Sequence, residues 1–343
     1  MRQAYIAETG TEGAEDPRSG SRFRAVLDRW RGDPGIWRRG IVLAVCAVAV
    51  AMLMIFHAQI PNRIGNLGSL TETFLPWLGV LVPVLLVGAL VRRSATALIA
   101  LLVPSVVWLN LFGGLVFDKA DGEGGKGGVT VATHNVNADN PDPEGTARQV
   151  AESGADVVAL EELKADAVPA YEKALAPAYR YHSVQGTVGL WSKYPMSDTR
   201  PVDIRLGWTR AMRSTVSTPD GELGVVVAHL PSVRVKLHAG FTANQRDASA
   251  DALGEAIARD ETPRVVLLGD LNGTMNDRSL NAVTSQMRST QGAAGDGFGF
   301  SWPASFPMAR IDQIMVKGVE PVSSWALPRT PSDHLPIAAR LRF

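Results

Sequence analysis

The chain has 343 residues, with 34 basic and 34 acidic side chains and a single cysteine, Cys46. One cysteine excludes a disulfide within the monomer, and the length allows a membrane segment together with one large folded domain. The formal charge of zero averages an arginine-rich start and a mildly acidic second half, so neither half is neutral by itself.

Residues 1–40 are polar and rich in glycine, proline, glutamate and arginine, which predicts a largely disordered N-terminus. Residues 41–117 contain three apolar runs, each close to the roughly 20 residues that a helix needs to cross a membrane. Prolines within the runs do not argue against helices, because membrane helices tolerate proline. We therefore expect three transmembrane helices, within Ile41–Ile60, Phe74–Val91 and Leu98–Phe117.

The basic residues predict how these helices are oriented. A cluster of arginines precedes the first run, and Arg92 and Arg93 separate the second run from the third. The connection between the first two runs carries only Arg63 and Glu72. The positive-inside rule places the arginine-rich segments in the cytoplasm. Three crossings then predict a multi-pass protein of the cell membrane whose second half is extracytoplasmic.

Residues 118–128 read DKADGEGGKGG, a polar and glycine-rich sequence that predicts a flexible linker. A segment of this length spans at most about 40 Å. We therefore expect residues 129–343 to form an extracytoplasmic domain that is held close to the outer membrane surface.

Strand-like and helix-like segments alternate through residues 129–343. Val129–Asn135 and Arg264–Gly269 are apolar enough for buried strands, and Pro219-Asp220-Gly221 predicts a hairpin between Ala211–Thr218 and Glu222–His229. Phe241–Arg259 has helical composition. Hairpins mixed with helical connections favour an α/β fold, with strands in two sheets and helices outside.

Polar side chains stand where the apolar strands end, and loops at strand ends commonly carry function. They are Asn135, Glu161, Glu162, His229, Asp270, Asn272, Asp312, Asp333 and His334. Carboxylates drawn from Glu162, Asp270 and Asp333 suit a hard divalent cation such as Mg²⁺, which prefers oxygen ligands. A histidine beside a phosphate can exchange protons, and Asp312 would orient His334.

The order of these motifs resembles that of the endonuclease/exonuclease/phosphatase superfamily, from about Val129 to Phe343. Asn135 ends the opening strand, Leu160-Glu161-Glu162 stands for the family's Leu-Gln-Glu, and Gly269-Asp270-Leu271-Asn272 stands for Gly-Asp-Phe-Asn. Arg310-Ile311-Asp312 and Ser332-Asp333-His334-Leu335-Pro336 complete the set. The resemblance implies a four-layer α/β/β/α sandwich of the DNase I type and dependence on a divalent metal, Mg²⁺ or alternatively Mn²⁺.

The resemblance also implies roles for individual residues. His334 is the general base, oriented by Asp312, and His229 protonates the leaving group or binds phosphate. Asp270, Asn272 and Asn135 orient the phosphate and the attacking water. Glu162 and Asp333 are the metal ligands, while Glu161 replaces the family's glutamine and adds negative charge beside them. Arg213 lies where relatives often place a basic residue near the phosphate, although a solvated face explains it equally well.

The charge of the second half bears on the substrate. From Gly128 onward there are 24 acidic and 21 basic side chains, so the domain lacks the basic footprint typical of nucleic-acid binding. A local basic groove would escape this count. The short linker favours a lipid substrate at the outer leaflet, and the architecture resembles VanJ-type teicoplanin-resistance membrane phosphatases.

That resemblance implies hydrolysis of a lipid-linked pyrophosphate, undecaprenyl pyrophosphate, in the recycling of the cell-wall carrier, with glycopeptide resistance as a further implication. Two alternatives remain: an extracytoplasmic nuclease or sphingomyelinase-like phosphodiesterase, and a non-catalytic sensor of a wall ligand. No protein partner is inferable. A basic loop of Arg234, Lys236 and His238 is either a site for pyrophosphate or headgroups or an ordinary polar loop.

Overall fold

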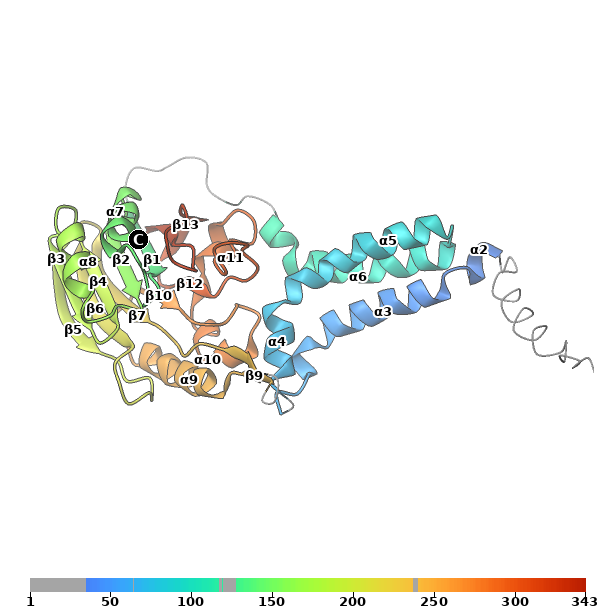
Figure 1. The fold of residues 1–343 in the computed structure, drawn as a ribbon, viewed down its shortest axis with the longest axis horizontal. Coiled ribbons are helices and arrows are strands. Elements are labelled where there is room, and N and C mark those ends of the chain that lie inside the picture. The colour runs from blue at the N-terminus through green and yellow to red at the C-terminus, as the bar shows by residue number, and fades with distance from the viewer. Residues whose placement is uncertain (1–34, 64, 117–118, 120–127, 237–239) are drawn as a thin grey trace, which may run out of the picture.

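The computed structural model describes residues 35–63, 65–116, 119, 128–236 and 240–343. A slender group of apolar helices projects from a compact α/β domain (Figure 1). Of the N-terminal residues 1–40 expected to be largely disordered, residues 1–34 lie outside the described residues, whereas Gly35–Arg38 form a short helix. Most of the expected linker, residues 118–128, and His238 also lie outside the described residues.

The α/β domain contains two six-stranded sheets. The first has the strand order β13-β14-β1-β2-β4-β3 and the second the order β11-β12-β10-β7-β6-β5. The first sheet consists of β13 (Glu320–Ala326), β14 (Ile337–Arg342), β1 (Val129–Asn135), β2 (Val157–Glu161), β4 (Val188–Ser192) and β3 (Tyr181–Gln185). The second consists of β11 (Arg288–Ser289), β12 (Asp312–Lys317), β10 (Val265–Asp270), β7 (Gly221–Ala228), β6 (Ala211–Thr218) and β5 (Met196–Pro201).

Three apolar cores divide the domain into four layers. Alternate side chains of each central strand point to opposite faces, so Val131 of β1 and Val266 of β10 meet in the core between the sheets. The outer face of the first sheet packs on α7 (Pro143–Glu152) and α8 (Val168–Leu175). The outer face of the second packs on α9 (Asn244–Ala258) and α10 (Asn281–Thr284). The expected α/β/β/α sandwich is therefore present.

Short elements complete the domain. They are the β8 (Arg234–Lys236) and β9 (Gly240–Thr242) hairpin, the 3-10 helix η3 (Arg278–Leu280) and α11 (Thr290–Ala294), which lies against β13. The helix expected to begin at Phe241 begins at Asn244, because Gly240–Thr242 pairs with β8 instead.

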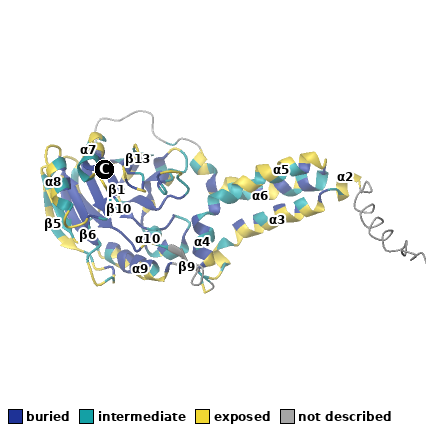
Figure 2. Cartoon of the chain, in the orientation of Figure 1, coloured by how far each residue is buried: buried dark blue, intermediate teal, exposed yellow. Residues whose placement is uncertain are grey.

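The apolar helices form the elongated part of the molecule. They are α2 (Gly35–Arg38), α3 (Ile41–Ile55), α4 (Leu67–Thr73), α5 (Leu81–Val91) and α6 (Ala95–Val116), with the 3-10 helices η1 (His57–Gln59) and η2 (Leu75–Val80). Small residues such as Ala47, Ala89 and Ala97 fill the contacts between α3, α5 and α6. Large apolar side chains, including those of Val45, Val84 and Leu102, face outward (Figure 2).

The lengths of these helices only partly match three spans. Within the described residues, α6 is long and apolar enough to cross a membrane. The second run lies, apart from Phe74, within the η2–α5 segment, Leu75–Val91, which meets the preceding helix α4 at a bend of 66°. Helix α3 ends at Ile55 rather than Ile60, and its 15 residues rise only about 22 Å. Helix length therefore supports one span, or two if the bent pair counts as one.

Candidate active site

Strand pairing brings the polar strand ends to one edge of the two sheets. Asn135 pairs with Glu161 across the parallel strands β1 and β2, and Asp270 pairs with Asp312 across β10 and β12. Glycine is required just before Asp270, because Gly269 has a φ of 144° and a Cβ there would overlap the Ala228 carbonyl oxygen. The short Gly-Asp motif is thus explained by close packing of β10 against β7.

Asp270 lies at the centre of the cluster and is almost fully buried. Its Oδ2 accepts hydrogen bonds from Asn135 Nδ2 at 3.1 Å and from Asn272 Nδ2 at 3.0 Å. Asn272 turns back toward it, because its φ of 46° is left-handed and its backbone N–H donates to Asp270 Oδ1 at 2.8 Å. Burial raises the pKa of Asp270 to about 7, although the nearby charge of His334 opposes this. The surrounding groups therefore do not fully compensate the anion of Asp270.

His334 and Asp312 form a buried pair. Nδ1 of His334 lies 2.9 Å from Asp312 Oδ2, which leaves Nε2 facing Asp270 Oδ2 at 3.9 Å. Burial disfavours the imidazolium, but the negative charges of Asp312 and Asp270 outweigh burial and raise the pKa of His334 to about 10. Burial alone would raise the pKa of Asp312, yet the charge and hydrogen bond of His334 lower it. The predicted orientation of His334 by Asp312 is present.

His229 follows β7 on the other side of Asp270, and its Nε2 lies 3.7 Å from Asp270 Oδ2 and 3.6 Å from Glu162 Oε1. The guanidinium of Arg210 contacts its ring. Burial and then the charge of Arg210 hold the pKa of His229 well below its usual range. The low pKa favours a neutral His229 ring, and protonation of the leaving group by His229 stays a prediction. Binding of phosphate by its N–H remains compatible with the geometry.

The two glutamates after β2 face different surroundings. Glu162 has a left-handed φ of 62°, lines the pocket and accepts a hydrogen bond from the backbone N–H of Ala138. Glu161 is fully buried, and its Oε1 accepts a hydrogen bond from Thr133 Oγ1 at 2.7 Å. Burial raises the pKa of Glu161 well above its usual range. The expected extra negative charge at Glu161 is therefore disfavoured, and a protonated carboxyl there has nearly the shape and charge of the glutamine amide expected from the resemblance.

The donor set fits a divalent metal. Ligand atoms of Asp270, Asp312 and His334 all lie within 4.8 Å of one another. Asp312 is already hydrogen-bonded to His334, so the carboxylates available to a cation are those of Asp270 and Glu162. Nε2 of His229 lies within 4 Å of both carboxylates. A cation would stabilise the Asp270 anion that burial disfavours. Asp333 is exposed and does not line the pocket, and its Oδ1 accepts a hydrogen bond from Asn137 Nδ2 at 3.1 Å.

Arg213 does not reach this cluster, which corrects its expected role in phosphate binding. Its guanidinium is buried on β6 among Asp260, Asp198 and Thr262, at 3.1, 2.6 and 2.6 Å. The hairpin register is the physical reason, because Arg213 pairs with Val226 in the middle of β7. By the same register Arg210 lies opposite His229, whose backbone N–H donates to the Arg210 carbonyl. Arg210 is the basic residue at the site.

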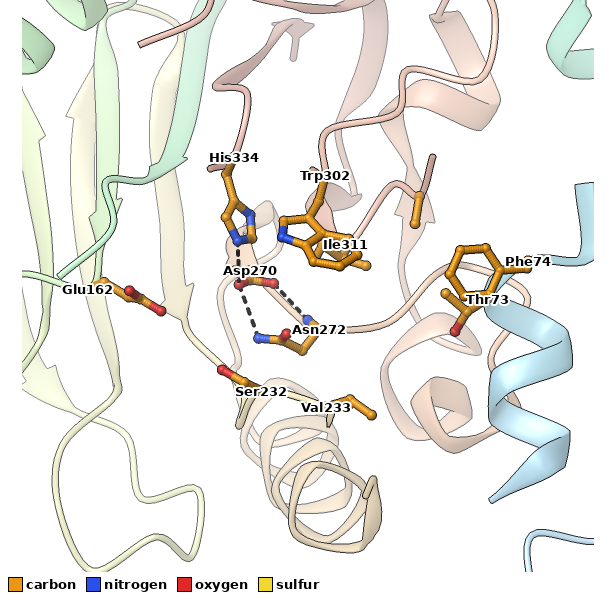
Figure 3. A pocket seen from close by; sticks show the side chains of 11 residues that line it. Thr73, Phe74, Glu162, Ser232, Val233, Asp270, Asn272, Trp302, Ile311 and His334 are labelled. Carbon is orange, nitrogen blue, oxygen red and sulfur yellow. Dashed lines mark hydrogen bonds and ion pairs between the residues drawn. The ribbon is translucent and has the colours of Figure 1, made fainter. Parts of the chain in front are cut away.

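A pocket of about 430 Å³ opens over the cluster (Figure 3). Glu162, Asp270, Asn272 and His334 are the predicted site residues that line it. Its remaining lining was not predicted from the sequence and comes from three places: Ser232 and Val233 after β7, the segment of Trp302, Ala309 and Ile311, and Thr73 and Phe74 from the apolar helices. None of the described lining residues is arginine or lysine.

The arrangement suits hydrolysis at phosphorus. His334 can exchange a proton through Nε2, Asp312 fixes its ring, and Asn272 and Asn135 hold the central carboxylate. Arg210 and His229 offer N–H donors on the opposite side, and the Nε of Arg210 has no partner among the described residues. Donors placed around a developing negative charge stabilise the transition state.

Comparisons with known proteins identify the family and the fold. The model of the endonuclease/exonuclease/phosphatase family matches residues 132–334. No curated protein matches the chain significantly. Among solved structures, a mannosyl-6-phosphatase from Bacteroides thetaiotaomicron is 19% identical with a TM-score of 0.51, over 63% of this chain and 100% of that one.

Two further solved structures share the fold. An endonuclease/exonuclease/phosphatase from Beutenbergia cavernae is 20% identical with a TM-score of 0.51, over 63% of this chain and 71% of that one. D. rerio TDP2, complexed with a single-stranded DNA product, is 18% identical with a TM-score of 0.53, over 63% and 99%. The match of the family model over most of the α/β domain shows that the chain belongs to the endonuclease/exonuclease/phosphatase family and is a phosphoester hydrolase.

Proposed function

We propose that the protein is a membrane-anchored, metal-dependent phosphatase that acts outside the cell on a lipid pyrophosphate, most simply undecaprenyl pyrophosphate. The observation that carries this proposal is the junction of two features in one chain. A phosphoester site with an acid–base pair lies in a domain joined to helices whose outer faces are apolar (Figure 2). Recycling of the wall carrier and glycopeptide resistance would follow from this activity.

The proposed anchoring uses α3, α5 and α6, with the N-terminus in the cytoplasm and the α/β domain outside. Their exposed valine and leucine side chains favour contact with lipid, because such a large apolar surface is costly in water. The arginines before α3 and between α5 and α6 favour this orientation. Labelling of a Cys46→Ser, Glu222→Cys double variant by an impermeant thiol reagent on whole cells tests it. Protection of the introduced thiol until the cells are lysed contradicts it.

In the proposed reaction, the pyrophosphate enters the pocket with its terminal phosphorus facing His334. A divalent cation, Mg²⁺ or Mn²⁺, held by Glu162 and Asp270, would polarise the phosphate oxygens and offset the charges that raise the pKa of His334. Nε2 of His334 takes a proton from water, and the water oxygen bonds to the terminal phosphorus. The bond to the bridging oxygen breaks, and the lipid monophosphate leaves as inorganic phosphate forms.

The competing activities differ in their products. A nuclease would degrade DNA, but the acidic balance of the domain and the absence of arginine and lysine from the described pocket lining disfavour it. A sphingomyelinase-like enzyme would release a phosphorylated headgroup instead of inorganic phosphate. A non-catalytic sensor would not need the buried His334–Asp312 pair beside Asp270.

The test is an assay of the purified full-length chain in detergent with Mg²⁺. Undecaprenyl pyrophosphate, plasmid DNA and sphingomyelin are offered in parallel, with Asp270→Asn as the inactive variant and Asp251→Asn, on the exposed face of α9, as the matched control. We expect inorganic phosphate from the pyrophosphate with the wild type and with the control variant. Degradation of DNA or headgroup release without inorganic phosphate would assign one of the other activities.

A further inference from the structure

The apolar helices are joined to the catalytic domain through buried polar contacts at α4. Glu72 is fully buried, and its carboxylate accepts from Arg278 Nε at 2.8 Å and from the Arg278 backbone N–H at 3.1 Å. Arg278 Nη2 also donates to the carbonyl of His57 at 2.9 Å. Loss of Arg278 would leave the buried Glu72 carboxylate as an uncompensated charge, which is costly. The junction is therefore fixed in place.

A second set of contacts continues from α4 to the active site. Ser69 Oγ donates to Asp277 at 3.0 Å and accepts from Arg246 Nη2 at 3.1 Å. Arg246 also forms an ion pair with Asp277 at 2.8 Å, and its Nη1 donates to the carbonyl of Asn272 at 2.8 Å. The buried Arg246 thus hydrogen-bonds both the backbone of Asn272 and Ser69 of α4, and so links the active site to the apolar helices.

Aromatic side chains close the junction next to the pocket. Trp77 Nε1 donates to the carbonyl of Met308 at 2.8 Å, and its ring stacks on Phe300 with centroids 5.9 Å apart. With α4 held on both sides, Thr73 and Phe74 at its C-terminal end lie in the wall of the active-site pocket (Figure 3).

The wall of the pocket is apolar around its polar floor. Phe74, Trp302, Ile311, Ala309 and Val233 line it together with the phosphoester cluster. A second cavity, of about 350 Å³, shares Thr73 with the pocket. Leu111, Phe112 and Leu115 of α6 and Phe298 and Phe300 line it, together with polar side chains such as Lys119, Gln291 and Arg310. Apolar side chains therefore line both the pocket and the adjoining cavity, which reaches the helix that is long enough to cross a membrane.

We propose that Thr73 and Phe74, supplied by the apolar helices, form the hydrocarbon-binding wall of the active site and make the enzyme selective for phosphates carried on a long lipid chain. The first methylenes of the chain lie against Phe74, Trp302 and Ile311, and the chain continues over Thr73 toward α6. This inference deepens the proposed phosphatase function and rests on it. The apolar helices are then part of the substrate site as well as an anchor.

The test measures inhibition by alkyl phosphonates, from ethyl to dodecyl, of the hydrolysis of a water-soluble aryl phosphate by the full-length chain. Burial of a methylene strengthens binding by up to about fourfold. We expect the inhibition constant of the wild type to fall steadily as the chain lengthens. The slope of this series should flatten in Phe74→Ala and recover in Phe74→Leu, which restores an apolar side chain.

The matched control is Phe306→Ala, which removes an exposed phenylalanine that packs beside Trp77 and does not line the pocket. It should keep the wild-type slope. An inhibition constant that does not depend on chain length in the wild type, or an equal loss of slope in Phe74→Ala and Phe306→Ala, overturns the inference.

Failure of the inference is distinguishable from failure of the proposed function. If inorganic phosphate is released from undecaprenyl pyrophosphate while the phosphonate series is flat, the phosphatase function stands and the hydrocarbon wall is wrong. If the series is steep and Phe74-dependent but the lipid pyrophosphate is not hydrolysed, the wall stands and a different lipid phosphoester is the substrate.

Discussion

Asp312 lies 2.9 Å from Nδ1 of His334 in a pair that is almost completely removed from solvent. This contact determines which ring nitrogen faces the pocket, and the charge of Asp312 contributes to the raised pKa of His334. Replacement of Asp312 by asparagine keeps the shape of the side chain and removes its charge.

We expect Asp312→Asn to lower kcat by about a hundredfold to ten-thousandfold, the range typical of a disturbed acid–base group. Without the carboxylate, the pKa of His334 should also fall, because burial then acts with less opposition. Titration of the His334 ring by NMR in wild type and variant checks this. A kcat near that of the wild type, or an unchanged His334 pKa, would contradict the assigned pair.

Asp270 makes stability depend on pH in a defined direction. Its pKa in the folded chain is raised to about 7, above the usual value of 3.8, so the folded state binds the proton more tightly than the unfolded state. The stability this provides is complete below the unfolded pKa and is lost as pH rises through about 7. In metal-free protein, Asp270→Asn should therefore raise Tm above neutral pH, because the asparagine cannot ionise.

With added Mg²⁺ or Mn²⁺, the wild type should have a higher Tm than Asp270→Asn, because a bound cation stabilises the native wild type by mass action. Thermal unfolding with and without metal provides the measurement, and Asp251→Asn is the control. Equal metal-induced shifts in wild type and Asp270→Asn would show that Asp270 does not contribute to a cation site.

Replacement of Arg210, which precedes β6, should reduce activity, whereas replacement of Arg213, within β6, should reduce stability. Arg210→Gln removes a guanidinium that contacts His229 and lies near Asp270 and Glu162, so we expect a loss of kcat/KM of about tenfold to a thousandfold with little change in Tm. Arg213→Gln leaves the half-buried Asp260 without its cation and should destabilise the fold by about 3 kcal/mol. Steady-state kinetics beside unfolding curves separates them. A loss of activity with little change in Tm in Arg213→Gln, and a loss of stability in Arg210→Gln, would instead place Arg213 at the site.

Glu161→Gln should be tolerated. Burial raises the pKa of Glu161 well above its usual range, which favours the protonated carboxyl, and an amide has nearly the shape and charge of that form. We expect kcat within about threefold of the wild type and an unchanged or higher Tm, since burying a neutral group costs less than burying a charge. A large fall in activity in Glu161→Gln, matched by Glu161→Ala, would show that the anion is required.

Local sequence was sufficient to predict the central strands and much of the site. The apolar strand before Gly269-Asp270 and the Ser332-Asp333-His334 motif each place a functional group next to a recognisable element. The edge strands β3 and β5 were missed because their side chains are polar and largely solvent-facing, so they lack the apolar pattern of a buried strand.

The contribution of the apolar helices to the pocket could not be predicted, because it depends on partners far apart in the chain. Glu72 was noted only as a charge between two apolar runs, whereas in the structure it is buried against Arg278. The position of Arg210 beside His229, by contrast, could have been predicted from the sequence. The predicted hairpin turn at Pro219-Asp220-Gly221 sets a register in which Arg210, and not Arg213, lies opposite His229.

Inorganic phosphate release from undecaprenyl pyrophosphate by the detergent-solubilised full-length chain is the most direct measurement of the central claim. The account predicts Mg²⁺- or Mn²⁺-dependent release that is abolished in Asp270→Asn and retained in Asp251→Asn. Absence of metal-dependent phosphate release by the folded wild type, or equal release by Asp270→Asn, would contradict it.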